Sequence, residues 1–409
     1  MSMRISTSQL FQLGIKSVLD QQATVSKLQQ QIASGKRIQS PADDPTGAVR
    51  ILDVRQAIDT TSQYQRNINL ARERLAVEDS TLDSSVDVLQ RVRELAIQAN
   101  NDTQNPQTRA AIATEIRQRL EDLMALANTT GANGEYIFSG FSTKTQPFAV
   151  DGAGNHVYQG DQGQRFLQVS ATRQVADRDT GADVFMNLAT GNGSFAVSDN
   201  AANTGSGIID PGSVTDYAVL TGDDYRIVFS NGAADPSAPA DQYEILDGDG
   251  NSLATGAYTS GAAIEFDGIQ THITGAPNHG DEFNVGPSGI QDVFTTVRDL
   301  AIALEGDNGT LQSRTRLHNA TSQFLMNIDQ AEDKLLQTRA AVGARMNVVD
   351  TQENLNEDFT LNLSKTLSSI EDLDFAEAVS LLQQQLTGLE AAQAAFVRVQ
   401  GLSLFDYLR

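Results

Sequence analysis

The stretch that decides the fold is residues 64–99, which read YQRNINLARERLAVEDSTLDSSVDVLQRVRELAIQA. From Tyr64 onward, steps of four and three residues alternate, and nine of the eleven positions reached are apolar or aromatic. This is the heptad pattern of a helix that packs along one seam, and only Glu78 and Ser85 interrupt it. The pattern therefore predicts a long helix in a bundle or coiled coil. The eleven positions are Tyr64, Ile68, Ala71, Leu75, Glu78, Leu82, Ser85, Leu89, Val92, Ala96 and Ala99.

The neighbouring sequence predicts where this helix begins and which helices accompany it. A capping residue followed by proline occurs at Asp44-Pro45 and again at Asn105-Pro106, and this pair is typical of a helix start. Gly131 suits the end of the second helix, because glycine tolerates the left-handed conformation found there. The expected helices span residues 45–100, 106–131 and 317–342, the last of which repeats the alternation of four and three.

Both ends of the chain carry the same kind of seam. Each is rich in Gln and poor in charge, and neither is hydrophobic enough for lipid. An amphipathic helix at a free end is stable only with a partner, so we expect the two ends to pair with each other and then with copies of the chain. The residues expected at this assembly interface are Phe11, Ile15, Val18, Val25, Ile32, Val379, Leu382, Leu386, Leu389, Phe396, Leu404 and Phe405.

The middle third has a different composition. Residues 151–289 hold 21 of the 32 glycines and carry a net charge of −15, whereas the other 270 residues carry −8. Glycine and aspartate at this density separate short strands, which predicts one small antiparallel sandwich or barrel. We expect residues 190–215, which are poor in bulky side chains, to form a mobile loop. The strand candidates are residues 157–158, 166–169, 225–229, 243–246, 263–266, 269–273 and 283–285.

Composition and motifs exclude several function classes. The 409 residues contain no cysteine, which removes thiol catalysis and disulfides, and the net charge of −23 argues against nucleic-acid binding. No apolar run is long enough for a membrane helix, and no cleavable signal peptide is expected. Asp247-Gly248-Asp249-Gly250-Asn251 resembles the start of a calcium loop but lacks its later ligands, which favours a hairpin turn. We therefore predict no enzyme activity, catalytic residue, metal or cofactor.

Several motifs resemble those of a known family. Residues 32–47 read IASGKRIQSPADDPTG and residues 90–98 read QRVRELAIQ, and both segments resemble bacterial flagellins and their hook-associated relatives. The opening MRIST at residues 3–7, the segment GEYIFSGFSTKTQPF at 134–148 and the closing SLFDYL at 403–408 are similar to the hook-associated branch. The segment GDEFNV at 280–285 recurs in those relatives as well.

The resemblance implies an α+β multidomain protein whose two ends form a long helical coiled coil and bundle around an inserted all-β domain. The implied divisions are a terminal coiled coil (1–42 and 370–409), a helical bundle with a β-hairpin at 134–148 (43–150 and 290–369) and a β-rich outer domain (151–289). The implied function is to join the hook, through another hook-associated protein, to the flagellin filament. A filament-forming flagellin is the alternative.

The resemblance also implies partners and a location. Expected partners are flagellin, the neighbouring hook-associated protein, copies of the chain in a ring and a type III export chaperone, with no nucleic acid and no membrane insertion. The expected location is the extracellular flagellum, reached through the flagellar type III apparatus. In flagellin the segment matching 90–98 is implied in subunit packing and in recognition by a host toll-like receptor, and packing alone is the favoured interpretation. The residues concerned are Gln90, Arg91, Arg93, Glu94, Leu95 and Gln98.

Overall fold

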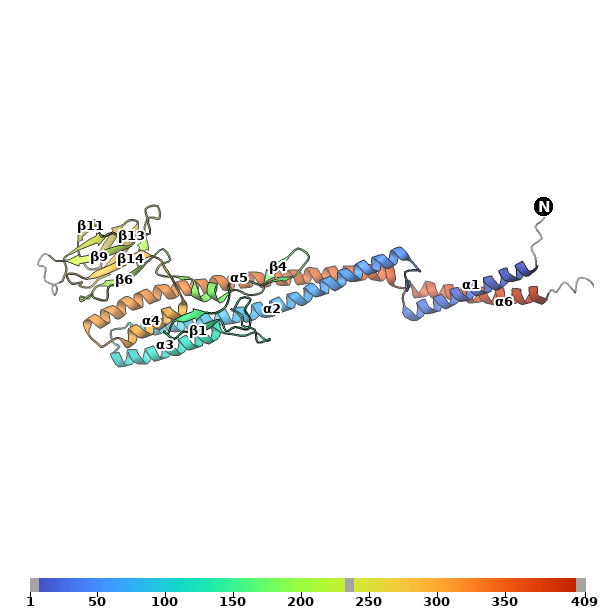
Figure 1. The fold of residues 1–409 in the computed structure, drawn as a ribbon, viewed down its shortest axis with the longest axis horizontal. Coiled ribbons are helices and arrows are strands. Elements are labelled where there is room, and N and C mark those ends of the chain that lie inside the picture. Colours follow the sequence, from blue (N-terminus) through green and yellow to red (C-terminus); the bar gives the residue numbers. More distant parts are fainter. Residues whose placement is uncertain (1–6, 232–238, 402–409) are drawn as a thin grey trace, which may run out of the picture. The chain divides into compact units, whose positions relative to one another are not determined.

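The computed structural model describes residues 7–231 and 239–401, and the chain divides into two compact units. Unit 1 comprises Met1–Arg66 with Gln352–Arg409, and unit 2 comprises Asn67–Thr351. The fold class expected from the sequence is confirmed, because helical end regions enclose a β-rich middle (Figure 1). The division into three domains stays a prediction.

The two helices marked by a capping residue and a proline begin at Pro45 and Pro106, as the sequence indicates, whereas the helix expected at 317–342 is longer and spans Leu311–Glu371. The second helix ends earlier than predicted, because the N–H of Asn128 already closes the last turn on Met124 O (3.1 Å) and Ala125 O (3.2 Å). Gly131 instead lies in the following turn, where its N–H donates to Glu135 O at 2.8 Å. The α-helices of the described residues are α1 (Thr7–Ser34), α2 (Pro45–Ala99), α3 (Pro106–Ala127), α4 (Val293–Glu305), α5 (Leu311–Glu371) and α6 (Phe375–Gly401).

The seam of α2 is the centre of the helical part of unit 2. Every seam position from Ile68 to Ala99 is at most 1% exposed, including Glu78 and Ser85. The polar side chain of Ser85 is tolerated in this core because its hydroxyl donates a hydrogen bond to Thr81 O at 2.8 Å. The partners in this core come from α3, α4 and α5 and include Ile116, Leu123, Val297, Leu300, Ile328 and Leu335.

Short strands connect the helices of unit 2 to the outer sheets. The predicted hairpin lies at 148–158 rather than at 134–148, where the backbone forms turns and a single bridge, Thr130 to Tyr136. A buried cluster of Phe138, Phe148, Phe185 and Phe294 packs this region onto the helices. The elements are β1 (Phe148–Val150) with β2 (His156–Tyr158), β3 (Phe166–Gln168) with β4 (Gln174–Ala176), the π-helical turn η1 (Ala182–Met186), and β5 (Leu188–Ala189) with β15 (Ile290–Gln291).

The middle of the chain forms two antiparallel sheets around a second core, which confirms the sandwich. One sheet has the order β11-β10-β9-β14-β6, and the other has the order β12-β13-β7 with β8 beside β13. The predicted turn at Asp247 joins β10 to β11, and its carboxylate accepts from Asn251 N at 2.8 Å. The strands are β6 (Phe195–Asp199), β7 (Ile208–Ile209), β8 (Ser213–Val214), β9 (Tyr225–Ser230), β10 (Gln242–Leu246), β11 (Ser252–Ala257), β12 (Ala263–Phe266), β13 (Ile269–Thr274) and β14 (Glu282–Pro287).

The prediction of a loop at residues 190–215 is wrong, because this segment contains the strands β6, β7 and β8. Phe195 and Val197 are buried where β6 pairs with β14, a partner about ninety residues away that a local pattern cannot reveal. The buried carboxylate of Asp281 fixes the segment further by accepting from Thr204 N (2.8 Å) and Gly205 N (2.9 Å). This contact gives the motif at 280–285 a structural role.

Candidate assembly interface

The candidate assembly interface begins with α1 and α6, which pack antiparallel in unit 1 (Figure 1). The alignment of the two helices along each other is seen where a glycine of one helix lies close to a side chain of the other. A β-carbon added at Gly14 would lie 3.1 Å from the ring of Phe396, and one added at Gly388 would lie 2.5 Å from Gln21 Nε2. At the other end of the pair, Gly35 lies against Phe375. The two terminal seams are therefore brought together, as the sequence analysis expects.

A two-helix pair covers only part of this seam. Val25 is 6% exposed and thus buried, whereas Ile15, Val379 and Leu386 are 42%, 50% and 38% exposed. The other predicted interface residues whose side chains the structure describes are half-buried: Val18, Ile32, Leu382, Leu389 and Phe396. The side chain of Phe11, together with Leu404 and Phe405, lies outside the described residues.

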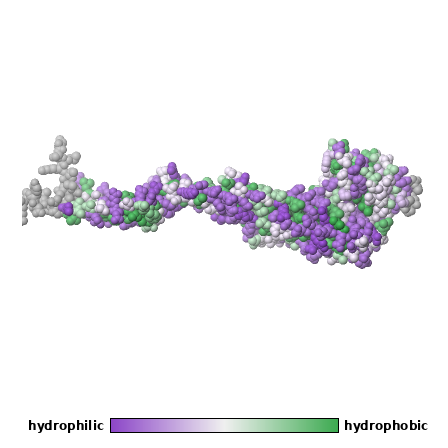
Figure 2. Space-filling model, turned by 180° about the vertical axis from the view of Figure 1, so that it is seen from behind, coloured by the Kyte–Doolittle hydropathy of each residue, from purple (hydrophilic) through white to green (hydrophobic). Residues whose placement is uncertain are grey.

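Further apolar side chains lie on the outer faces of the same two helices. Leu13 and Leu19 are each 58% exposed and Val397 is 64% exposed, and Figure 2 shows hydrophobic residues at the surface of these helices. The heptad reading omits these positions because they flank the seam rather than forming it. Apolar side chains on both sides of a helix pair indicate more than one packing partner.

The rest of unit 1 carries an apolar surface that the sequence analysis missed. Val49 and Leu52 on α2 are 58% and 65% exposed, and Leu355 and Phe359 on α5 are 55% and 52% exposed. Each pair is spaced by three or four residues and so lies on one helix face. Leu52 also lines a surface groove of about 690 Å³ beside the start of α2. A helical-face plot that allowed two faces per helix would have found these residues.

A charged clamp fixes the segment between α1 and α2. Glu371, at the end of α5, accepts from Arg55 Nη2 at 2.6 and 2.7 Å and also pairs with Lys36. Burial alone would raise the pKa of Glu371, but hydrogen bonds from Lys36 and Arg55 outweigh it and lower that pKa. Arg37 N donates to Glu371 O at 2.7 Å, so backbone and side chain hold the same turn.

The side-chain carboxylate of Asp43 holds the turn at residues 39–43. Lys27 Nζ lies 2.6 Å from Asp43 Oδ1, while Ser40 N donates to Asp43 Oδ2 at 2.9 Å. These contacts, Lys27 first, lower the pKa of Asp43 below its usual range. The family-like motif at 32–47 is thus a turn that orients α1 against α2 through ionic and backbone contacts.

The segment predicted for receptor recognition or packing lies on α2 in unit 2. Leu95 is 1% exposed and belongs to the bundle core, whereas Gln90, Glu94 and Gln98 are exposed. Arg91 pairs with Glu94 and with Glu115 of α3, and Arg93 pairs with Asp329 of α5. The exposed positions share one face of the helix, and a role for them stays a prediction.

The described residues hold no group of three or more His, Asp or Glu side chains that could bind a metal ion. Within the same residues, every helix is too short or too polar for a membrane span.

The comparisons with known proteins give the class of the chain. Models of the N-terminal and C-terminal helical regions of bacterial flagellin match residues 5–143 and 325–408. The chain is thus a flagellin-like protein with a β-rich middle region.

The longer matches give the family. The flagellar hook-associated protein 3 of Escherichia coli (strain K12) is 26% identical over 404 residues, 99% of either chain. FlgL of Xanthomonas campestris is 34% identical with a TM-score of 0.71, covering 77% of this chain and 99% of that one. The flagellar junction protein FlgL of Legionella pneumophila is 30% identical with a TM-score of 0.71, and the match covers 79% of this chain and 100% of that one. The chain belongs to the family of flagellar hook-associated protein 3.

True flagellins match a smaller part. Flagellin B of Helicobacter pylori is 32% identical over 149 residues, which is 35% of this chain and 28% of its own.

Proposed function

We propose that this chain is a structural subunit of the bacterial flagellum that joins the hook, through another hook-associated protein, to the flagellin filament. The observation that supports it most is the incomplete burial of α1 and α6, because Ile15, Leu19 and Val397 remain 42%, 58% and 64% exposed in the single chain. A relative that is 30% identical and is covered over its whole solved chain is named a flagellar junction protein. The proposed role is mechanical and needs no catalytic residue or cofactor.

Assembly would complete the burial that folding begins. Fully burying one such side chain contributes roughly 1.5–3 kcal/mol, so a half-exposed one still has about 1 kcal/mol to gain. Several per subunit, repeated around a ring of copies, would hold the junction firmly while a lone subunit stays soluble. The apolar positions of unit 1 on α2 and α5 would add a second contact band in the same ring.

The same proposal covers location and export. The subunit would act in the extracellular flagellum, after passage through the flagellar type III apparatus with an export chaperone. The exposed seam of α1 and α6 offers such a chaperone the surface that later contacts neighbouring subunits. The exposed positions Gln90, Glu94 and Gln98 would contribute to packing between subunits.

A double substitution on the outer face tests the assembly role. Leu19→Gln with Val397→Gln should leave the melting temperature of the lone subunit within about 2 °C, because both side chains are already exposed. The same variant should fail to restore swimming in cells that lack the native gene. The matched control is Leu253→Gln, a 48% exposed leucine on β11, which should restore swimming. Normal swimming by the double variant would contradict the proposal.

The alternative function, a filament-forming flagellin, predicts a different behaviour of the purified chain. A flagellin polymerises by itself into long filaments when salted out, whereas a junction subunit stays monomeric without its neighbours. Light scattering and electron microscopy across an ammonium sulfate series distinguish the two. Long filaments would favour the alternative.

A further inference from the structure

Glu78 interrupts the apolar seam of α2 and yet is 1% exposed. Its Oε1 accepts a hydrogen bond from the backbone N of Asp179 at 2.9 Å. Its Oε2 is buried and has no hydrogen-bond partner among the described residues. A buried carboxylate oxygen without a donor is costly, and a proton on that oxygen would turn it into a donor.

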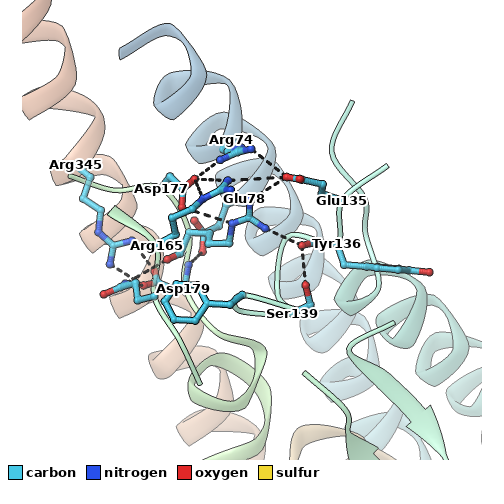
Figure 3. Close-up of polar contacts among 12 residues, drawn as sticks. Arg74, Glu78, Glu135, Tyr136, Ser139, Arg165, Asp177, Asp179 and Arg345 are labelled. Atoms are coloured by element: carbon cyan, nitrogen blue, oxygen red, sulfur yellow. Dashed lines mark hydrogen bonds and ion pairs between the residues drawn. The ribbon is translucent and has the colours of Figure 1, made fainter. Parts of the chain in front are cut away.

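Charged groups from five parts of unit 2 surround Glu78 (Figure 3). Two further carboxylates, Asp177 and Asp179, come from the segment after β4, and both are buried. Oδ1 of Asp177 is the second buried carboxylate oxygen of the cluster that accepts no hydrogen bond within the described residues, although Arg178 Nε lies 3.6 Å from it. The remaining members are Arg74 on α2, Glu135 in the turn after α3, Arg165 before β3, Arg178 after β4 and Arg345 on α5.

The cluster fixes one segment of backbone. Asp179 binds Arg345 through two hydrogen bonds of 2.8 and 2.9 Å, while Asp177 pairs with Arg74 and Arg165. Gly181 N then donates to Phe138 O at 2.8 Å. Residues 177–181 lead directly into η1 and β5, through which the chain passes from the helical core to the outer sheets. Whatever loosens 177–181 therefore loosens one of the connections to the β-rich part.

We propose that Glu78 is an alkali-sensitive latch: its protonated carboxyl holds residues 177–181 against α2 and α5, and its ionisation releases them. Ionised Glu78 is a third carboxylate beside Asp177 and Asp179, and its unpaired oxygen gains a charge that no donor meets. Arg345, the cation whose charge opposes that of Glu78, is already bound to Asp179. Release lets water reach the carboxylates and removes the conflict.

Electrostatics supports this geometry. Burial, followed by the charge of Asp179, raises the pKa of Glu78 to about 8 from the usual 4.5. A raised acid pKa means that the folded state binds a proton that the unfolded state has released. The stabilising effect is complete below pH 4.5 and is lost as the pH rises through about 8. The latch therefore holds most firmly in acid and weakens as the pH rises from 4.5 to about 8.

Amide hydrogen exchange on the full chain tests the latch. After correction for intrinsic exchange, the opening of the amides of Asp177, Asp179 and Gly181 should rise up to roughly tenfold for each pH unit as the pH approaches about 8, and should level off above it. Glu78→Gln keeps the acceptor for Asp179 N and cannot ionise, so its protection should be independent of pH. Asp179→Asn removes the nearest like charge, so the transition should move to lower pH. The matched control is Glu73→Gln, an exposed acid on the same helix, which should behave as the wild type.

Two results would overturn the latch: a wild type with constant protection of 177–181 from pH 6.5 to 9.5, or a Glu78→Gln variant with the full wild-type pH dependence. Should Glu78→Gln not fold, carbon NMR of the wild type labelled at glutamate carboxyls replaces it. The latch requires one glutamate to titrate near pH 8, and a set that all titrates near the ordinary value contradicts it.

Discussion

Unit 1 and unit 2 use the same heptad pattern with different results. In unit 2, the seam of α2 from Ile68 to Ala99 is at most 1% exposed, because α3, α4, α5 and the short strands surround it. In unit 1, α1 and α6 pack mainly against each other among the described residues, and Ile15 and Val379 on their seam remain 42% and 50% exposed. The difference shows that a heptad pattern predicts a buried helix face, but it does not tell whether the covering residues come from the same chain or from another one.

The two units also differ in how they bury charge. Unit 2 holds a fully buried pair, in which Arg109 Nη1 lies 2.7 Å from Asp307 Oδ2 with both side chains at 0% exposure. In unit 1 the buried carboxylate of Glu371 is met by Lys36 and Arg55, each 46% exposed. Water can replace the cations in unit 1 and cannot in unit 2, so losing a charge should cost unit 2 more.

The largest effect is expected for Arg109→Ala in unit 2. The change strips Asp307 of its partner and also removes the donors that bind Ala99 O (3.0 Å) and Asn101 O (3.3 Å) at the end of α2. The free energy of unfolding of unit 2 should fall by roughly 3–5 kcal/mol. Differential scanning calorimetry measures this loss of stability.

The control is Arg117→Ala, which breaks an exposed pair with Glu305 and should cost under about 1 kcal/mol. Equal costs would erase the contrast between buried and exposed charge.

An intermediate effect is expected for Glu371→Gln in unit 1. The glutamine keeps the shape and loses the charge, so unit 1 should lose about 1–2 kcal/mol after allowance for its half-exposed partners. Since the pKa of Glu371 is lowered, its contribution is present above the ordinary value and is lost as the pH falls through the lowered one. The variant and wild type should therefore differ at pH 7 and converge in acid. A difference that persists at pH 2 would show that charge is not the cause.

The smallest effect compares two helical glycines. A β-carbon at Gly343 in unit 2 meets nothing within 4 Å, so Gly343→Ala should stabilise α5 by about 1 kcal/mol. A β-carbon at Gly14 in unit 1 meets the Phe396 ring at 3.1 Å, so Gly14→Ala should gain less, because the ring must shift. Thermal unfolding of the two variants measures the difference. A larger gain at Gly14 would mean that α1 and α6 are not closely packed there.

The sequence predicted what depends on local period and little that depends on distant partners. The seam from Tyr64 to Ala99 and the strand at 225–229 were predicted well, since alternation alone defines them. The strands within 190–215 were missed, because β6 owes its place to β14. Glu78 was visible only as a fault in the seam. Its meaning comes from Asp179 and Arg345, which lie 101 and 267 positions along the chain.

The candidate interface shows the same limit. Pairing of the terminal seams followed from their matched patterns, and the register of Gly14 with Phe396 followed only from the structure. The exposed apolar residues of α2 and α5, such as Leu52 and Phe359, were overlooked because one seam per helix was assumed.

The central claim is that unit 1 completes its core only when subunits assemble, and hydrogen exchange of α1 and α6 tests it most directly. The amides of residues 7–34 and 375–401 should exchange at least a hundredfold faster in the free subunit than those of residues 67–127 in unit 2. In isolated hook–filament junctions they should become protected to the level of unit 2. Full protection of α1 and α6 in the free subunit, unchanged on assembly, would contradict the account.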